Sequence, residues 1–323
     1  MKTVAILSNY INTLVIPPLY IFPHQKLTRM FRDSGIELRR VSIHSFDKEK
    51  GVFLDYVDMD KEGNFVTFHE EYRPDVIWNR SGDNGHFYTY NIFEKAGIPI
   101  FPSSKVIGID SDKYEMFLFL EKYQPISLLL KDFFESETSR NKLGEKLVLK
   151  PIRSFGGHGI EFYTQQELLE NANKYIGLES LYVVQEFKDF SKGIPGLTSN
   201  NHDIRLVYIG GKYSHTTMRM PAKGGLKSNV GSGGSKRFLY EQEIPKALFS
   251  LGENVLKDLD LSDNSILSID FGYVLDEDRW YVFEINSSPG VYFCADDEKM
   301  ANDFYNAYFV DLINFFNTKY FNN

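Results

Sequence analysis

The chain has 323 residues, more than one ordinary hydrophobic core needs, so we expect two or three lobes. Its formal net charge of -8 argues against a general nucleic-acid binder and against a basic membrane-surface protein. The single cysteine, Cys294, excludes an internal disulfide, and without a Cys/His cluster a structural zinc site is not expected. No apolar run reaches the ~18 residues of a membrane span, which favours a soluble, cytoplasmic protein.

Residues 1–108 are expected to form an open α/β domain, because strand and helix patterns alternate along them. An apolar run predicts a first buried strand, and a following helix ends at Gly35. A hairpin-like insert with a turn near 60–64 interrupts the alternation. The expected elements are a strand at 2–8, a helix at 23–35, strands at 75–80 and 98–101, and a helix at 90–97.

The rest of the chain predicts two further lobes, an α+β unit over 109–187 and a larger one over 188–323. A loop at 188–202, rich in Gly, Pro, Ser and Asn, opens the last lobe. The second lobe is expected to hold helices at 111–123 and near 165–175, and strands at 145–151, 160–164 and 181–187. The third is expected to hold a hairpin turning at Gly210–Gly211, a glycine loop at 224–234, a helix at 244–258, a hairpin within 268–290 and an amphipathic helix at 297–320.

The hairpin within 268–290 carries acids where a core strand would have apolar residues. If it turns at 276–278, Asp270 faces Glu284, and Asn286 shares their side of the sheet. Facing carboxylates repel each other unless a cation lies between them. Two acids and an amide offer only oxygen ligands, which suit Mg²⁺ or Mn²⁺ rather than zinc.

Two readings of this hairpin stay open at this point. The opposite side is expected to be a continuous core face made of Leu267, Ile269, Phe271, Tyr273, Tyr281, Phe283 and Ile285. A slip of one residue in register would instead turn the acids into a solvated face that only aids solubility. The metal site and the solvated face are about equally supported by the hairpin alone.

Two glycine-rich stretches and several basic residues are candidates for phosphate contacts. Lys150 stands at a strand end before Gly156, Gly157 and Gly159, and such a loop lets backbone N–H groups approach phosphate closely. Each feature also has a plain structural interpretation, as a tight turn, a surface loop or a solvated side chain. The second stretch, 223–237, holds further basic residues, and Lys113, Arg205 and Arg219 complete the set that could neutralise a triphosphate.

Taken in order, these segments resemble the ATP-grasp superfamily, in its glutathione synthetase and RimK-type glutamate ligase branch. The resemblance covers about residues 105–295 and rests on "SDKYEMFLFL", "LVLKPIRSFGGHGI", "VVQEF", "DIRLVYIGGK", "KSNVGSGG" and "SIDFG…YVFEINSSPG". It implies a two-lobed ATP-grasp fold preceded by an N-terminal open α/β (pre-ATP-grasp) domain. The segment between "QEF" and "DIR" is long here, and Lys227 stands where RimK-type enzymes usually have arginine.

The resemblance also implies roles for individual residues. Arg205 and Arg219 would stabilise the transferred phosphoryl group. The implied ATP contacts are Lys113, Lys150, Gly156, Gly157 and Gly159 at the phosphates, Glu186 and the Phe187 backbone at adenine, Asp203 at the ribose, and Lys227, Ser228 and Asn229 in a nucleotide-proximal loop. Asp270, Glu284 and Asn286 match the magnesium ligands. Arg80, in "WNRSGDNG", is a candidate for a substrate carboxylate or for a structural ion pair.

The leading hypothesis is an ATP- and Mg²⁺-dependent carboxylate–amine ligase acting through an acyl phosphate. Its partners would be amino acid or peptide substrates, or a protein terminus, with no nucleic acid and no membrane; a homodimer is a family expectation. Two alternatives are an ATP-grasp kinase acting on a small hydroxylated substrate, and a synapsin-like nucleotide-binding regulator with little turnover. The sequence identifies neither substrate.

Overall fold

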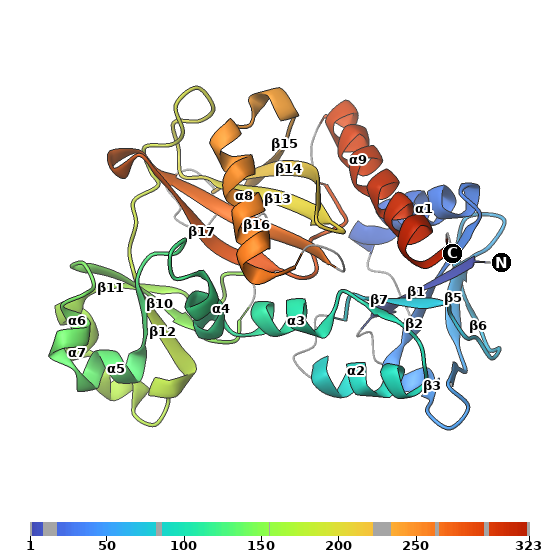
Figure 1. The fold of residues 1–323 in the computed structure, drawn as a ribbon, viewed down its shortest axis with the longest axis horizontal. Helices are drawn as coiled ribbons and strands as arrows, with labels where there is room; N and C mark the ends of the chain where they lie inside the picture. Colours follow the sequence, from blue (N-terminus) through green and yellow to red (C-terminus); the bar gives the residue numbers. More distant parts are fainter. Residues whose placement is uncertain are drawn as a thin grey trace.

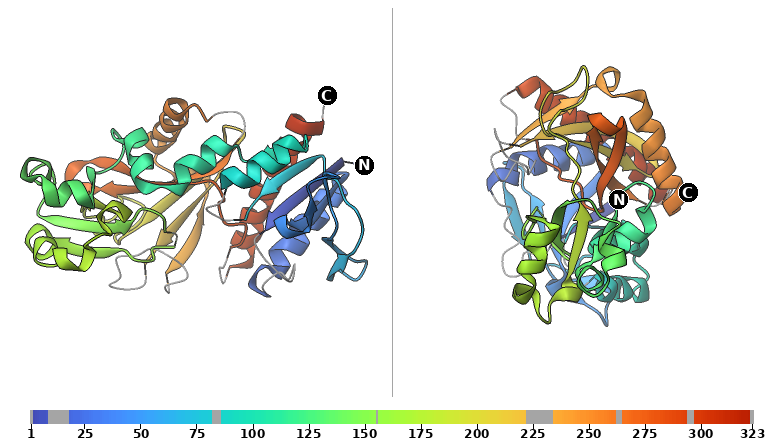
Figure 2. Two further views of the ribbon diagram at one scale, coloured as in Figure 1. Left: turned by 90° about the horizontal axis from the view of Figure 1, so that it is seen from below. Right: turned by 90° about the vertical axis from the view of Figure 1, so that its left-hand side faces the viewer.

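The computed structural model describes residues 2–8, 18–81, 86–154, 156–221, 234–261, 265–293 and 297–321. Three sheets follow one another along the chain (Figure 1): a six-stranded sheet at the N-terminal end, a four-stranded sheet at the opposite end, and a five-stranded sheet beside both. A view turned by 90° about the horizontal axis shows the same succession along the long axis of the molecule (Figure 2, left). The expected lobe boundaries after residues 108 and 187 stay a prediction.

The six-stranded sheet has the order β6-β5-β2-β1-β7-β8. Its four parallel strands are β1 (Lys2–Ser8), β2 (Ile36–Ser42), β7 (Val76–Asn79) and β8 (Ile100–Phe101), and the inserted hairpin is β5 (Tyr56–Met59) and β6 (Phe65–Phe68). Two helices, α1 (Pro18–Asp33) and α2 (His86–Lys95), accompany it. β1 is central and almost continuously apolar, as expected of a parallel strand covered on both faces. The predicted first strand, hairpin insert and helices of this region are confirmed.

The four-stranded sheet is antiparallel, with the order β11-β10-β12-β9. Its strands are β9 (Ser127–Leu129), β10 (Lys146–Pro151), β11 (Glu161–Thr164) and β12 (Tyr182–Glu186). Helices α5 (Leu130–Glu135), α6 (Glu137–Arg140) and α7 (Gln165–Glu170) pack beside it (Figure 1). α7 begins where Thr164 and Glu167 form a reciprocal capping box, which satisfies backbone N–H groups of its first turn.

The helix predicted over 111–123 is confirmed in its central part, but a second helix that was not predicted precedes it. The structure has two helices here, α3 (Ser104–Ser111) and α4 (Lys113–Leu120), which lead from the first sheet to the second. Asp112 separates them because its carboxylate accepts hydrogen bonds from the backbone N–H groups of Tyr114 and Glu115, at 3.0 and 3.1 Å. This is the N-cap arrangement, and it fixes Lys113 as the first residue of a helix.

The five-stranded antiparallel sheet has the order β15-β14-β13-β16-β17. Its strands are β13 (Asp203–Ile209), β14 (Lys212–Met220), β15 (Ser235–Leu239), β16 (Ile266–Val274) and β17 (Arg279–Asn286). Helix α8 (Lys246–Leu259) shares one hydrophobic core with the sheet, and α9 (Glu298–Phe316) shares another. The core of α9 also includes residues of the N-terminal sheet, such as Trp78, so this helix joins the first and third sheets (Figure 1).

Short elements complete the secondary structure of the described ranges. They are β3 (Phe46–Asp47), β4 (Val52–Phe53), the 3-10 turns Ile43–Ser45, Ala172–Tyr175, Glu179–Leu181, Glu241–Glu243 and Leu275–Glu277, and a π-helical end at Asn317–Phe321. Among the helices of these ranges, none is both long and apolar enough to cross a membrane.

The β16–β17 hairpin pairs Asp270 with Glu284, as the sequence predicts. A bulge between Asp270 and Phe271 then shifts the register, so that Phe271 faces Val282. The expected core face is therefore wrong on β17 at Tyr281 and Phe283, because Val282 joins the core that contains α8 instead. Phe271 and Tyr273 of β16 contact this core as expected. The ring of Phe283 turns to the other side, where it packs edge-on against Phe190 with ring centroids 4.6 Å apart.

Candidate active site

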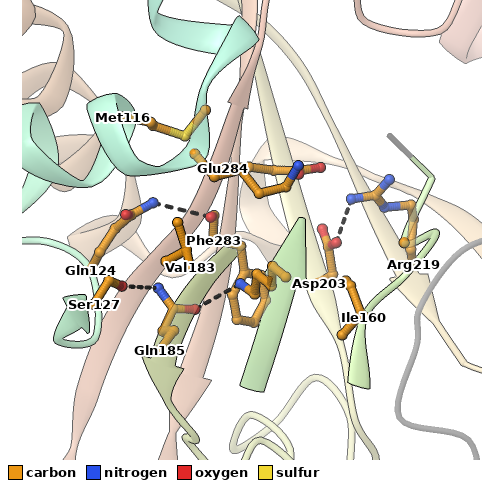
Figure 3. A pocket seen from close by; sticks show the side chains of 13 residues that line it. Met116, Gln124, Ser127, Ile160, Val183, Gln185, Asp203, Arg219, Phe283 and Glu284 are labelled. Carbon is orange, nitrogen blue, oxygen red and sulfur yellow. Dashed lines mark hydrogen bonds and ion pairs between the residues drawn. The ribbon is translucent and has the colours of Figure 1, made fainter. Parts of the chain in front are cut away.

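A cavity of about 180 Å³ lies where β10 and β12 approach β17 (Figure 3). A second cavity of about 140 Å³ shares part of its lining, including Lys150, Gln185 and Phe283. The first cavity is lined by Lys113, Met116, Gln124, Ser127, Lys150, Gly157, Ile160, Val183, Gln185, Asp203, Arg219, Phe283 and Glu284. The predicted phosphate-side lysines and the predicted metal ligand Glu284 thus face one space, although they come from three regions of the sequence.

Lys150 is held by a side chain that sequence reasoning missed. Its ammonium donates to Gln185 Oε1 at 2.7 Å, and Gln185 Nε2 donates to Ser127 Oγ at 2.9 Å. The three residues lie on adjacent strands β10, β12 and β9, so the sheet itself aligns them. Removal from water lowers the pKa of Lys150 to about 8; Glu284 opposes the shift, and Lys113 adds to it.

Lys113 meets the glycine loop from the other side. Its ammonium donates to the backbone carbonyl of Ser154 and, at 3.2 Å, to Ser154 Oγ. Burial lowers the pKa of this lysine as well, although nearby carboxylates such as Glu284 counteract the shift. The two lysines therefore border the same cavity, and each ammonium has lost some of its contact with water.

The predicted glycines bend the β10–β11 connection. Gly156, Gly157 and Gly159 have φ values of +66°, +73° and +72°, in the left-handed region that other residues rarely adopt. A Cβ at Gly159 would lie 2.6 Å from Pro151 Cγ, so the close return of the chain also requires glycine. Of the three, Gly157 lines the cavity.

Four charged side chains form a network on β13, β14 and β16. Arg205 binds Asp270 with two hydrogen bonds of 2.7 and 2.6 Å, and Arg219 reaches the same carboxylate at 2.5 Å. Arg219 also pairs with Asp203, which faces it across the β13–β14 ladder. Both predicted catalytic arginines are thus fixed by buried carboxylates rather than extended into water.

The pKa values of the two acids in this network are shifted in opposite directions. Burial opposes ionisation of Asp270, but Arg205 and Arg219 outweigh it and hold the pKa of Asp270 below its ordinary value. Burial raises the pKa of Asp203 to about 7, although Arg219 acts against the shift. Asp203, predicted at the ribose, lines the first cavity beside Arg219 (Figure 3).

The three predicted magnesium ligands converge. Asn286 Nδ2 lies 3.4 Å from Asp270 Oδ2 and 3.4 Å from Glu284 Oε1, and Glu284 faces the cavity. In the described ranges, no group of three or more His, Cys, Asp or Glu side chains is placed to hold a metal. The set here consists of two acids and an amide. The donor set fits a hard cation, since turning the amide of Asn286 would present its oxygen beside two carboxylates.

The segment predicted to bind adenine lines the second cavity, through Glu186 and Phe187. Glu186 pairs with Lys188 at 2.9 Å, and Lys188 reaches Glu277 on the β16–β17 turn at 2.9 Å. The N–H of Phe187 donates to the carbonyl of Lys146 at 2.9 Å. Because this N–H is already used, the carbonyl oxygen of Phe187 is the backbone group left to hydrogen-bond a base.

Of the four remaining predicted residues, the structure describes only Arg80. Lys227, Ser228 and Asn229 fall outside the described residues. Arg80 follows β7 and donates to the carbonyl of Pro289 at 3.0 Å, while its guanidinium lies 5.0 Å from the centre of the Trp78 ring. It therefore contacts the segment just after Asn286 and is not among the residues that line the two cavities.

Asp110 is a further residue that sequence reasoning missed. It accepts hydrogen bonds from the backbone N–H of Ser287 at 2.9 Å and from its hydroxyl at 2.5 Å. Burial raises the pKa of Asp110 to about 6, although the bonds from Ser287 oppose the shift. Since Ser287 follows Asn286, Asp110 anchors the end of the strand that presents two of the predicted metal ligands.

Comparison with known proteins agrees with the resemblance to RimK-type glutamate ligases described in the sequence analysis. No family model matches the chain. It is 26% identical over 247 residues to a probable alpha-L-glutamate ligase of Vibrio vulnificus, covering 73% of this chain and 76% of the relative. A probable alpha-L-glutamate ligase of Coxiella burnetii is 29% identical over 234 residues, covering 68% of this chain and 70% of the relative.

Among solved structures, the RimK domain ATP-grasp protein of Sphaerobacter thermophilus matches with a TM-score of 0.59 and 12% identity, over 97% of this chain and 99% of that one. The ATP-grasp ligase PsnB, complexed with a phosphomimetic precursor variant, Mg and ADP, matches with a TM-score of 0.56 and 14% identity, over 97% and 99%. The chain thus has the ATP-grasp fold of these ligases, as predicted. In sequence, the chain has distant homology to the probable alpha-L-glutamate ligases.

Proposed function

We propose that this protein joins a carboxylate to an amine at the expense of ATP, through an acyl phosphate, and releases ADP and phosphate. The observation that carries the proposal is the convergence of Lys113, Lys150, Arg219 and Glu284 on one cavity. Phosphoryl transfer requires charge neutralisation and positioning more than a nucleophilic side chain, and this lining supplies the charges. The names of the glutamate ligase relatives support the same class of reaction.

The nucleotide is expected to occupy both cavities. The second cavity has apolar side chains such as Val148, Ile160 and Phe162 together with the Glu186–Lys188 segment, a combination suited to a purine base. The shared lining at Lys150 leads into the first cavity, where Lys113 and the Gly157 region would meet the phosphates. Asp203 would face the ribose. Lys227, Ser228 and Asn229 stay a prediction for a segment that lies close to the nucleotide.

Magnesium would be held by Asp270, Glu284 and Asn286, whose oxygen atoms suit it. When bound, it would offset phosphate charge and polarise the phosphoryl oxygens. The structure supports this role through the contacts among the three side chains. Asp270 also keeps Arg205 and Arg219 in place, so its carboxylate would serve the cation and the arginines together.

The chemistry follows from what a carboxylate lacks. Its carbon–oxygen bond breaks only after the oxygen becomes a good leaving group. Attack of a carboxylate oxygen on the γ-phosphorus breaks the bond to the ADP oxygen and gives an acyl phosphate and ADP. The amine then attacks the carbonyl carbon, loses a proton and expels phosphate. Arg205 and Arg219 would stabilise the negative charge of the phosphoryl group during both steps.

The substrates are proposed to be an amino acid and another amino acid, a peptide or a protein terminus. The test is ADP release by the full chain with Mg²⁺, ATP and a panel of amino acids and peptides, in the presence of hydroxylamine. An acyl phosphate reacts with hydroxylamine to give a hydroxamate, so hydroxamate and amide together should equal the ADP that is released. ADP release that needs no carboxylate, or a stable phosphorylated product, would refute the proposal.

A further inference from the structure

Ser268 on β16 has a buried hydroxyl without a hydrogen-bond partner. The residue is 0% exposed, and within the described part of the chain its Oγ atom forms no hydrogen bond. Such a group lowers stability, because burial removes its bonds to water and no protein group replaces them. Alanine would fill nearly the same space without this cost. Packing alone therefore does not account for a serine at this position.

Ser268 lies at the boundary between an apolar core and the predicted metal ligands. On one neighbouring strand it faces Val207 of β13, which belongs to the core that contains α9. On the other it faces Asn286 of β17. Asp270, two residues later on β16, faces Glu284 in the same ladder. Because alternate residues of a strand share one face, the hydroxyl of Ser268 lies on the face of the three predicted ligands, directly opposite the amide.

The amide of Asn286 directs its nitrogen toward the two acids. Its Nδ2 atom lies 3.4 Å from Asp270 Oδ2 and 3.4 Å from Glu284 Oε1. A cation held by these acids needs the amide oxygen there instead, since an amide N–H group offers no lone pair to a metal. The amide must therefore turn over when a cation binds. This turn carries both N–H donors away from the carboxylates, and a half-buried amide then needs a new acceptor.

We infer that Ser268 is a positioning residue for Asn286: its hydroxyl accepts a hydrogen bond from Asn286 Nδ2 when the amide oxygen is turned toward the metal. The inference rests on the proposed function, because it takes the three oxygen ligands from it. Ser268 is the residue opposite Asn286 on β16, and its oxygen has no other partner in the described ranges. The hydroxyl thus favours the amide orientation that binds a cation, at a cost in stability to the metal-free protein.

The metal-free and metal-bound states respond in opposite ways to Ser268→Ala. Without metal, the variant removes a buried polar group that has no partner, so it should unfold at a higher urea concentration than the wild type. With metal, it removes the acceptor for Asn286 Nδ2, so the metal should bind more weakly. A serine that only fills space would leave metal binding unchanged.

The test measures the affinity of the full chain for a non-hydrolysable ATP analogue by calorimetry, once with Mn²⁺ and once with EDTA. The ratio of the two affinities reports the metal site, because a change confined to the nucleotide cavity alters both. Ser268→Ala should lower this ratio about tenfold, the effect expected of one lost hydrogen bond. Asn286→Asp has no N–H group, so adding Ser268→Ala to that variant should leave its ratio nearly unchanged.

Tyr208→Phe is the matched control. The Tyr208 hydroxyl is also buried without a partner in the described ranges, but it belongs to the core that contains α8. Its removal should raise the urea midpoint and leave the affinity ratio unchanged.

Three results would overturn the inference. They are a wild-type affinity ratio near one, a ratio that Ser268→Ala leaves unchanged, and an equal loss when Ser268→Ala is added to Asn286→Asp. A lower urea midpoint for Ser268→Ala would also contradict it. Because the ratio involves no turnover, hydroxamate formation still tests the proposed function separately, and it can succeed where this inference fails.

Discussion

The two sides of the site differ in how their charges are arranged. On the proposed nucleotide side, acids and bases alternate: Arg205 and Arg219 both pair with Asp270, and Arg219 also pairs with Asp203. On the other side, next to the segment 287–293, Arg80 and Lys236 donate hydrogen bonds to backbone carbonyls. A carbonyl fixes the place of a cation but carries no full charge. Ion pairs between strands therefore hold the first side, and hydrogen bonds to carbonyls connect the second side to the segment 287–293.

The largest effect is expected from Glu284→Gln, which keeps the shape of the nucleotide side but removes one charge. Loss of one metal-binding carboxylate should lower kcat/KM about 10³-fold, equal to roughly 4 kcal/mol of transition-state stabilisation. The free energy of unfolding should change little, because Glu284 is only half-buried. Steady-state kinetics across Mg²⁺ concentrations, with chemical denaturation of the same samples, make the measurement.

Asp276→Asn is the control for this variant. It lies on the exposed turn of the same hairpin, where it pairs with Lys192 at 2.6 Å. Its kcat/KM should stay close to that of the wild type. If Glu284→Gln keeps wild-type turnover, Glu284 is not a ligand of the proposed metal.

Much of the nucleotide side could be predicted from sequence because its residues lie at fixed spacings on hairpins. The facing of Asp270 and Glu284 followed from strand pairing alone. The bulge after Asp270 could not be predicted, because alternation of apolar residues looks similar on either side of an extra residue. Val282 and Phe283 are both apolar, so the sequence pattern is the same whichever of them faces the core.

The residues that were missed depend on contacts between distant segments. Gln185 stands inside the "VVQEF" motif, and its position on β12 opposite β10 was the one signal that could have pointed to Lys150. Asp110 meets Ser287 from 177 positions away. Neither composition nor spacing carries that information.

A stability comparison of two arginines tests the difference between the sides directly. Arg219→Met leaves two buried acids without their shared partner, which should cost about 3 to 5 kcal/mol of unfolding free energy. Arg80→Met removes a hydrogen bond to a carbonyl and should cost about 1 to 2 kcal/mol. Urea denaturation of both variants provides the values. An equal loss would show that the two arginines are held in the same way.

A pH titration gives a smaller effect. The pKa of Lys150 is lowered to about 8, so its ammonium loses its proton as the pH rises through that value. ATP phosphates favour the protonated form, so ATP affinity should fall roughly tenfold per pH unit above about 8. Lys150→Arg stays charged, so its ATP affinity should change little between about pH 7.5 and about pH 9.5. A wild-type affinity that is constant over this range would contradict the shift.

The central claim is that ATP activates a carboxylate, and isotope transfer tests it most directly. The full chain is supplied with ATP, Mg²⁺, an amine and an acyl donor whose carboxylate oxygens are both ¹⁸O. The mass of the released phosphate is then measured by mass spectrometry. The account predicts one ¹⁸O in each phosphate, because the acyl phosphate breaks at its carbonyl carbon. Phosphate without label, released together with ADP, would contradict it.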